Sequence, residues 1–522
     1  MNPQVRVSRA RRPLAALLAV AMAALGAPAV NAQDPPAELQ VSLRLQDCLA
    51  MALAHNLDIA VQRYDIEVSG TGEEQARAGF ESLLSTSYTE FEQVSENVDP
   101  FSGPPQTSIR GRQLVSTWND PTVWGGQFQV QFQASDTSAN FFLLDPTYET
   151  ALNLRYEQSL LRRFGVDVNQ APIEIAQNTT RISQAQFRDT VMTTVQATEF
   201  AYWDLVFARM DLQVKQQSLS LAGELLQMNR AKVEVGTMAP IDVTQAEAGV
   251  ASREEGVIVA DARVRNAEDA LRKLLNPPAD SPIWRSTIIP ADSPSFQPLS
   301  PDTDAALESA KLNRPELDQQ RLALQNYELQ ERIDRKATQW DLSAFGSYNL
   351  EGLGGTSEIL GFDESFGNAL GDLDRTEFAD WSLGVRLDIP LGNKAAKAQH
   401  TATTLRQQQA DAQMNNLLLT ADIDVRMKVR DVNTNIKRVE AARKNRELQQ
   451  KNVEAEQKKF DNGMSTSFTV LQIQEDLATA ESQENLAIID YNKSLVSLEK
   501  AKGTLIEARQ IQVAAPPDQA GT

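Results

Sequence analysis

The sequence predicts a mostly α chain with a small β part, in which long helical rods continue into a few amphipathic strands. Three observations predict this class. Each half of the chain holds a helical pattern of about 65 residues, the two halves repeat the same order of features, and several short segments alternate apolar and polar residues. At 1.5 Å per residue, such helices would be roughly 100 Å long.

The first element is an export signal. Residues 1–32 hold four arginines, then the apolar run "PLAALLAVAMAALGA", and then "VNA", which places small residues before a cut after Ala32. This layout predicts a signal peptide. The formal charge of the chain is −20. Without these arginines it would be about −24, which disfavours general nucleic-acid binding, and no nucleic-acid partner is expected.

Two halves follow the signal. Leu49–Arg63 aligns with Leu307–Arg321 at an offset of 258 residues, and Arg230–Glu247 aligns with Gln457–Gln474 at an offset of 227. Repetition of the same features in the same order indicates a duplicated chain. We therefore expect a first structural repeat over residues 33–276, a Pro-rich linker over 277–301, a second repeat over 302–510, and a disordered tail over 511–522.

The long helices are expected from about Ala171 to Val235 and from about Lys394 to Asn462. Apolar residues in both step by three and four, which is coiled-coil spacing. They are Phe200, Trp203, Phe207, Met210 and Val214 in the first half and Val425, Val429, Val432, Ile436 and Val439 in the second.

The strands carry the strongest functional signal. In "GQFQVQFQAS", Phe128, Val130 and Phe132 alternate with three glutamines, Gln127, Gln129 and Gln131. Successive strand side chains point to opposite faces, so the first set suits lipid and the second a water-filled lumen. Candidate strands lie at Leu83–Phe91, Gln127–Ala134, Ala151–Gln158, Ser343–Leu350 and Trp381–Ile389. One first-half candidate is interpreted as part of a hairpin or an extension, which leaves about four spanning strands per chain.

The segments between these strands are interpreted as long external loops, at Asn97–Gly126 and Glu351–Asp380. Four strands cannot close a barrel, and open edges in lipid leave backbone groups unbonded. A membrane location therefore requires several chains to share one barrel, and three chains would give twelve strands. The alternative is a small sheet that caps soluble helical hairpins.

The order of these features resembles the TolC family of outer-membrane efflux and secretion ducts, over nearly all of the mature chain. The motifs "VGTMAPIDVTQAE" and "NGMSTSFTVLQIQ" and the repeat starts "AHNLDI" and "LNRPEL" carry the resemblance. It implies a homotrimer whose twelve-stranded barrel sits in outer-membrane lipid and continues into a helical barrel across the periplasm. It also implies a periplasmic adaptor protein and an inner-membrane transporter as partners.

Two turns connect the long helices with their returning partners. Gly236 and Gly463 interrupt the helical patterns where the chain must reverse, and glycine accepts the positive φ of helix ends. Asp242 and Thr469 follow each glycine by six residues and are expected to cap the returning helices. The resemblance implies that these turns form a periplasmic tip and gate that also touches the adaptor.

Several tip residues depart from the family pattern. The resemblance matches Asp242 to a gate aspartate, but Phe460 replaces a tyrosine, Ser465 replaces an arginine, and Thr469 and Gln472 replace two aspartates. Gln245, in the first motif, completes the tip set. An acidic cation-binding ring is therefore not expected, and we expect a gate closed by apolar and neutral contacts.

Enzyme classes find no support in the sequence, because G-x-S-x-G, GK[ST] phosphate-loop and H-E-x-x-H motifs are absent. No cofactor and no metal site are expected. The resulting hypothesis is a passive exit duct of a tripartite efflux pump or a type I secretion system. The alternative is a soluble periplasmic coiled-coil adaptor or structural protein. The sequence does not identify the cargo.

Overall fold

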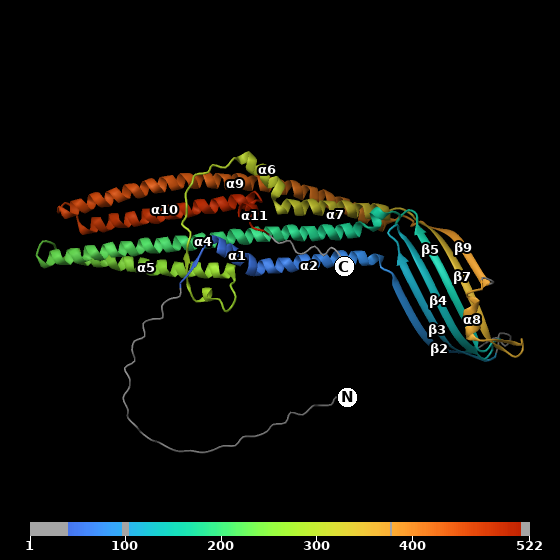
Figure 1. Cartoon of the computed structure of the whole chain (residues 1–522). Helices are drawn as coiled ribbons and strands as arrows, with labels where there is room; N and C mark the ends of the chain where they lie inside the picture. Colours follow the sequence, from blue (N-terminus) through green and yellow to red (C-terminus); the bar gives the residue numbers. More distant parts are fainter. Residues whose placement is uncertain (1–39, 97–103, 376–377, 513–522) are drawn as a thin grey trace, which may run out of the picture.

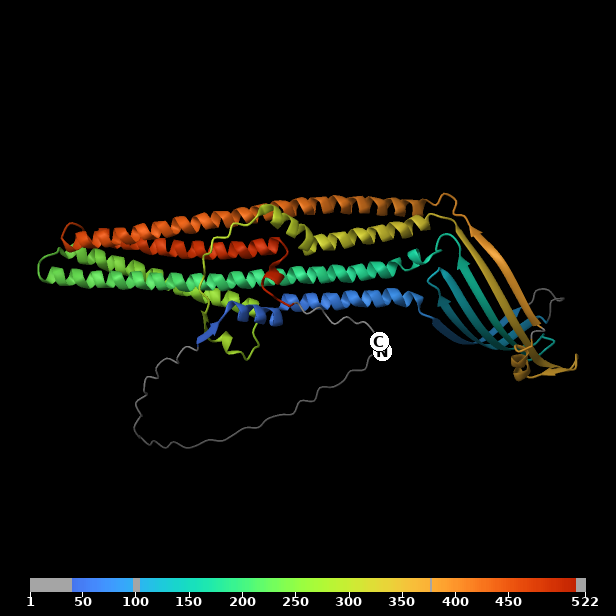
Figure 2. The ribbon, with the colours of Figure 1, turned by 45° about the horizontal axis from the view of Figure 1, so that its top comes forward.

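A computed structural model describes residues 40–96, 104–375 and 378–512. The predicted signal peptide and most of the predicted tail lie outside these residues. The molecule is an elongated bundle of helices with a curved β-sheet at one end (Figure 1). A second view shows the helical turns gathered at the end of the bundle farthest from the sheet (Figure 2).

The two halves contain matching helices, and the two longest begin and end within one residue of the prediction. The first half contains α1 (Leu45–His55), α2 (Leu57–Arg77), α3 (Val166–Asn169), α4 (Ala171–Glu234) and α5 (Pro240–Leu275). The second contains α6 (Thr303–Asn313), α7 (Pro315–Ala337), α9 (Lys394–Asp461), α10 (Ser467–Ala501) and α11 (Leu505–Ala508). Among the described residues, no helix is both long and apolar enough to cross a lipid bilayer.

The repeat offsets reappear in the backbone. A one-residue break separates α1 from α2 at Asn56 and α6 from α7 at Arg314, which are 258 positions apart. Gly236 and Gly463 both adopt positive φ, at 78° and 74°, and lie 227 positions apart. Since the same local conformations recur at the offsets found in the sequence, the backbone supports the proposed duplication.

The predicted apolar spacing forms the core of the helical bundle. Val425, Val429, Val432 and Val439 are buried in one cluster with residues of α6 and α10. In the first half, Trp203 is buried in a cluster that also contains residues of α1 and α5, and Phe207 and Met210 pack against this cluster. The stripes therefore hold each long helix against its neighbours in the bundle.

The sheet is larger than the sequence predicted. Its order is β2 (Leu83–Glu96), β3 (Gln106–Pro121), β4 (Gly126–Ala139), β5 (Thr147–Ser159), β7 (Asp341–Ser357) and β9 (Ala379–Asp388). All neighbours are antiparallel, and the short β8 (Phe362–Glu364) pairs with the distal end of β7. The prediction of about four strands per chain is wrong, because the sheet holds six long strands. The count of twelve strands for three chains rested on that prediction.

Both segments interpreted as loops contain regular structure. β3 lies inside Asn97–Gly126, and β8 and the short helix α8 (Phe366–Asp372) lie inside Glu351–Asp380. The sequence did not predict β3, because each face of this strand mixes apolar and polar residues. On one face, for example, Leu114 and Trp118 alternate with Arg112 and Ser116. A strand without a clean two-residue period gives no amphipathic signal.

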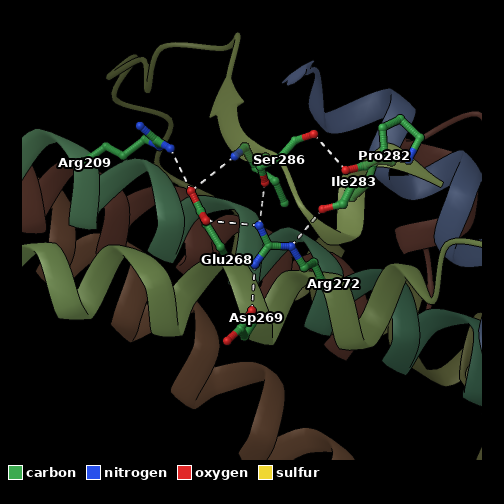
Figure 3. Close-up of polar contacts among 8 residues, drawn as sticks. Arg209, Glu268, Asp269, Arg272, Pro282, Ile283 and Ser286 are labelled. Carbon is green, nitrogen blue, oxygen red and sulfur yellow. Dashed lines mark hydrogen bonds and ion pairs between the residues drawn. The ribbon is translucent and has the colours of Figure 1, made fainter. Parts of the chain in front are cut away.

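The Pro-rich linker is also more ordered than expected. It holds a 3₁₀ turn at Pro282–Trp284 and a strand, β6 (Thr287–Pro290), which pairs in parallel with β1 (Gln40–Leu43). The Arg272 guanidinium on α5 donates to the carbonyl oxygens of Ile283 and Ser286, at 3.0 and 2.6 Å (Figure 3). Glu268 pairs with Arg209 and Arg272 and accepts a bond from the Ile288 amide. These bonds fasten the linker to the first half.

Candidate functional site: the helical tip and the two faces of the sheet

The two predicted turns lie together at one end of the bundle (Figure 1). Gly236 lies between α4 and α5, and Gly463 lies between α9 and α10. A Cβ at either glycine would meet no atom within 4 Å, so space does not demand glycine there. The left-handed φ does, because side chains other than Asn and Asp rarely adopt it.

Phe460 joins the two turns through apolar packing. It is 4% exposed and packs in a cluster with Ala222 and Leu225 of α4 and Val470 and Leu471 of α10. The Lys232 ammonium lies 4.3 Å from the centre of its ring, which adds a cation–π contact between α4 and α9. A tyrosine hydroxyl here would need a buried hydrogen-bond partner, whereas phenylalanine needs only apolar neighbours.

A buried amide adds a polar link between the same turns. Asn229 of α4 is fully buried, and its Nδ2 donates to Ser467 Oγ of α10 at 3.0 Å and to the Asp242 carbonyl oxygen at 3.4 Å. Its Oδ1 has no hydrogen-bond partner. Asn229 therefore fixes the relative position of α4, α5 and α10, at the cost of one unbonded buried oxygen.

The expected caps are wrong by three residues in both returning helices. The N-cap of α5 is Ala239, with Pro240 as the first helical residue, and the N-cap of α10 is Thr466, whose Oγ1 accepts from the Thr469 amide. Asp242 and Thr469 lie instead in the first helical turn. The Asp242 carboxylate there is stabilised by the partial positive charge of the helix N-terminus.

Ser465, which stands where the family pattern has an arginine, hydrogen-bonds to a local ion pair between Glu456 and Lys459. Its Oγ donates to Glu456 Oε1 at 2.5 Å, and the Lys459 ammonium contacts Glu456 Oε2 at 3.0 Å. The Ser465 hydrogen bond and the Lys459 ammonium hold the pKa of Glu456 below its usual range. The carboxylate therefore stays charged at neutral pH and holds the α9–α10 turn closed on itself.

The remaining tip residues face solvent. Gln245 and Gln472 are exposed, and Thr469 shares a hydrogen bond with Thr466 at 2.9 Å. The structure thus brings Phe460, Ser465 and Thr469 into contacts within the chain, and it leaves Gln245 and Gln472 exposed at the tip. The sequence reasoning missed Asn229, Glu456 and Lys232. The available signal was a polar residue, Asn229 or Glu456, that stands inside a heptad-like helical segment about two turns before each glycine.

The strand registers separate the sheet into two chemically distinct faces. Side chains directly opposite each other in an antiparallel pair lie on the same face. Val130 is opposite Trp118 on β3 and Leu154 on β5, so these three side chains share a face. Gln131 is opposite Thr117 and Asn153, and these share the other face.

The apolar face extends across all six long strands. Phe128 stacks on Tyr156 with ring centres 4.3 Å apart. By register, the apolar face further comprises Leu84 and Tyr88 on β2, Leu114 and Trp118 on β3, Val130 and Phe132 on β4, Leu152 and Leu154 on β5, Tyr348 and Leu350 on β7, and Trp381, Leu383, Val385 and Leu387 on β9. Most of these side chains have no core to cover them, and Leu383 is 79% exposed.

The polar face is equally continuous. One row runs Ser85, Thr117, Gln131, Asn153, Asn349 and Asp380, from β2 to β9. Asn153 bonds Asn349, and Asn349 bonds Asp380 at 2.9 Å. On the strand ends nearer the helices, Arg155 and Arg386 both contact Glu157. The residues predicted to face a lumen thus belong to a sheet-wide polar surface.

Charge limits the apolar face on the side away from the helices. Arg110 pairs with Glu92 at 2.7 Å and Arg112 with Glu90 at 3.7 Å, all on the face of Trp118. On β5 and β7, α8 lies over the same face, where Thr150 Oγ1 donates to the Ala369 carbonyl oxygen at 2.7 Å. By register, Thr150 is in the row next to that of Arg112, on the side of the helices. The apolar band therefore occupies only the part of the sheet next to the helical bundle.

A helical rod with paired turns at one end and an amphipathic sheet at the other is an architecture shared with solved outer-membrane channels. The Campylobacter jejuni CmeC outer membrane channel superposes with a TM-score of 0.63 at 15% identity, covering 88% of this chain and 86% of that one. The outer membrane protein VceC of Vibrio cholerae gives 0.63 at 15% identity, covering 88% and 96%. The fold is thus that of outer-membrane channel proteins.

Sequence comparison gives the family. The outer membrane efflux protein family model matches residues 152–277 and 306–504, and the chain belongs to this family. Outer membrane protein TolC of Vibrio cholerae is 25% identical over 346 residues, which are 64% of this chain and 73% of that protein. The predicted family and the location in the outer membrane, extending into the periplasm, are confirmed. Members are efflux channels rather than enzymes.

Proposed function

We propose that this protein is a passive exit duct in which three identical chains close one barrel in the outer membrane. The observation that carries the proposal is the two-faced sheet. Its apolar face, including Phe128, Val130 and Phe132, would meet lipid, and its polar face, including Gln127, Gln129 and Gln131, would line water. A single sheet of six long strands has two open edges, which lipid does not tolerate.

The helical bundle forms the periplasmic part of the duct in this proposal. The α4–α5 and α9–α10 turns are its far end, and the exposed Gln245 and Gln472 are available there to a periplasmic adaptor that connects an inner-membrane transporter. The energy for transport comes from that transporter, in a tripartite efflux pump or a type I secretion system. Membership of an outer-membrane family speaks against the alternative of a soluble periplasmic adaptor.

A pair of neighbouring substitutions tests the lipid and lumen faces. Val130→Lys places a charge on the apolar face, and Gln129→Lys places the same charge one residue away on the polar face. A lysine at the lipid midplane costs about 2–4 kcal/mol per chain, whereas a lumen lysine is tolerated. We expect Val130→Lys to abolish a heat-resistant oligomer in outer-membrane extracts and Gln129→Lys to retain it. Equal effects, or the reverse order, contradict the proposal.

The chemistry of the proposed gate follows from the uncharged residues at the tip. Thr469 and Gln472 carry no charge, and Phe460 is buried between the two turns. We propose that apolar and neutral contacts close the duct at this end. The gate and adaptor contact comprise Gly236, Asp242, Gln245, Phe460, Gly463, Ser465, Thr469 and Gln472. Bilayer recordings should show little block by multivalent cations, and Gln472→Asp should introduce block. Strong block of the unchanged protein at low cation concentration would refute this gate.

A further inference from the structure

Two edges of the sheet lack a partner in the part of the chain that the structure describes. β2 and β9 are the outermost long strands, and every residue of β2 is exposed. Proteins protect free edges with lysine, proline or bulges, but neither β2 nor β9 contains a lysine or a proline. On the apolar face, Tyr88 next to one edge and Trp381 and Leu383 next to the other remain uncovered.

The strand directions fit head-to-tail closure. β2 leaves the helical bundle, β3 returns, β4 leaves, β5 returns, β7 leaves and β9 returns (Figure 1). The β9 of one copy would therefore lie antiparallel to the β2 of the next. Because each chain contributes an even number of long strands, every junction between two chains would be antiparallel, like the strand pairs within the chain.

We infer that three copies build an eighteen-stranded barrel in which the β3–β4 hairpin of each chain is part of the wall. This inference rests on the proposed duct. The hairpin pairs along its whole length with β2 on one side and β5 on the other, and its apolar and polar residues continue the two faces of the sheet.

The consequence is a wide outer exit. Barrel diameter grows roughly linearly with strand number, so eighteen strands give about 1.5 times the diameter of twelve. Barrels of 16–18 strands hold an aqueous channel rather than a plug of side chains. α8 lies on the apolar face, away from the polar face, and leaves that channel open. Such an exit admits bulky or folded cargo, and selection of cargo falls to the tip and the partners.

Imaging of the purified full chain in lipid nanodiscs by electron cryomicroscopy tests the inference. Three copies that contribute eighteen strands to one closed barrel are expected. A closed threefold barrel of twelve strands, with β3–β4 packed outside the wall or in the lumen, overturns the inference but leaves the proposed duct intact. A chain without a closed oligomeric barrel overturns the proposed function itself.

Cysteine pairs give the same test in native membranes. The only native cysteine, Cys48, is fully buried. Gln131→Cys with Asn153→Cys places two thiols opposite each other on β4 and β5, and a disulfide is expected within each chain. The control pair Ser85→Cys with Asn153→Cys lies in the same row but is separated by β3 and β4. That separation of about 14 Å exceeds disulfide reach. Absence of the first bridge, or formation of the control bridge, overturns the inference.

Discussion

Arg272 provides the sharpest test of how the linker is held to the helical bundle. Its guanidinium is nearly buried and donates to the carbonyl oxygens of Ile283 and Ser286 and to two carboxylates on α5 (Figure 3). Arg272→Ala removes two of the bonds that fasten the linker, those to the carbonyl oxygens of Ile283 and Ser286. A hydrogen bond from a charged donor contributes about 1.5–3 kcal/mol, so local opening of the linker should become easier by at least about 3 kcal/mol.

Limited proteolysis measures this opening. Arg285 is the only basic residue of the linker, is exposed, and follows the 3₁₀ turn that Arg272 holds. The rate of cleavage by trypsin after Arg285 follows the population of the open linker. A decrease of about 3 kcal/mol in the free energy of opening should therefore make this cleavage roughly a hundredfold faster. Glu268 keeps its bonds from Arg209 and the Ile288 amide, so the helical bundle itself should survive the change.

Arg265→Ala is the matched control on the same helix. Arg265 is exposed and pairs only with Asp261, one turn away, at 3.0 Å. Such exposed pairs contribute about 0.3–0.5 kcal/mol, and the cleavage rate should change by less than about threefold. If Arg272→Ala accelerates cleavage no more than Arg265→Ala does, the bonds of Figure 3 do not hold the linker.

Two further predictions concern the tip. Phe460→Ala empties the cluster shared by α4, α9 and α10 and should lower the local stability of the tip by about 3–5 kcal/mol, seen as faster amide exchange. Phe468→Ala, at an exposed site on the same tip, should change it little. Because the pKa of Glu456 is lowered in the folded tip, its contribution is present above the unfolded pKa and disappears as pH falls through the lower folded value. The protection factors of tip amides, which correct exchange for its intrinsic pH dependence, should therefore fall on acidification below about pH 4. A Glu456→Gln variant whose protection factors fall equally would refute this cause.

The helices were predictable because their signals are local and redundant. Between Pro172 and Pro240 no proline interrupts the first rod, and the three–four spacing of apolar residues fixes which side is buried. The reversal points were also predictable, since Gly236 and Gly463 take the left-handed conformation that the turns require. The caps were misplaced because the start of α5 depends on Pro240 and that of α10 on Thr466, rather than on the acidic or hydroxyl residue expected.

The tip contacts could not be derived from the sequence. Asn229 and Ser467 lie 238 residues apart, and their bond depends on the way in which the two helical hairpins pack. The same holds for Lys232 over Phe460, which joins the two halves of the chain. Spacing arguments reach residues on one helix or one strand, whereas these contacts need the packing of distant segments.

The missed strand has a physical cause that also bears on the barrel. A spanning strand needs only about 9–11 residues in the hydrocarbon, but β3 holds 16 and β7 holds 17. The alternating signal exists only where one face meets lipid. On β3 that part is short, from Leu114 to Trp118, and the strand continues through Arg112 and Arg110, which pair with Glu90 and Glu92 of β2. A pattern search therefore reads the water-exposed part of a long strand as a loop. In the proposed barrel, those paired charges would mark the level at which the wall leaves the bilayer and continues outward.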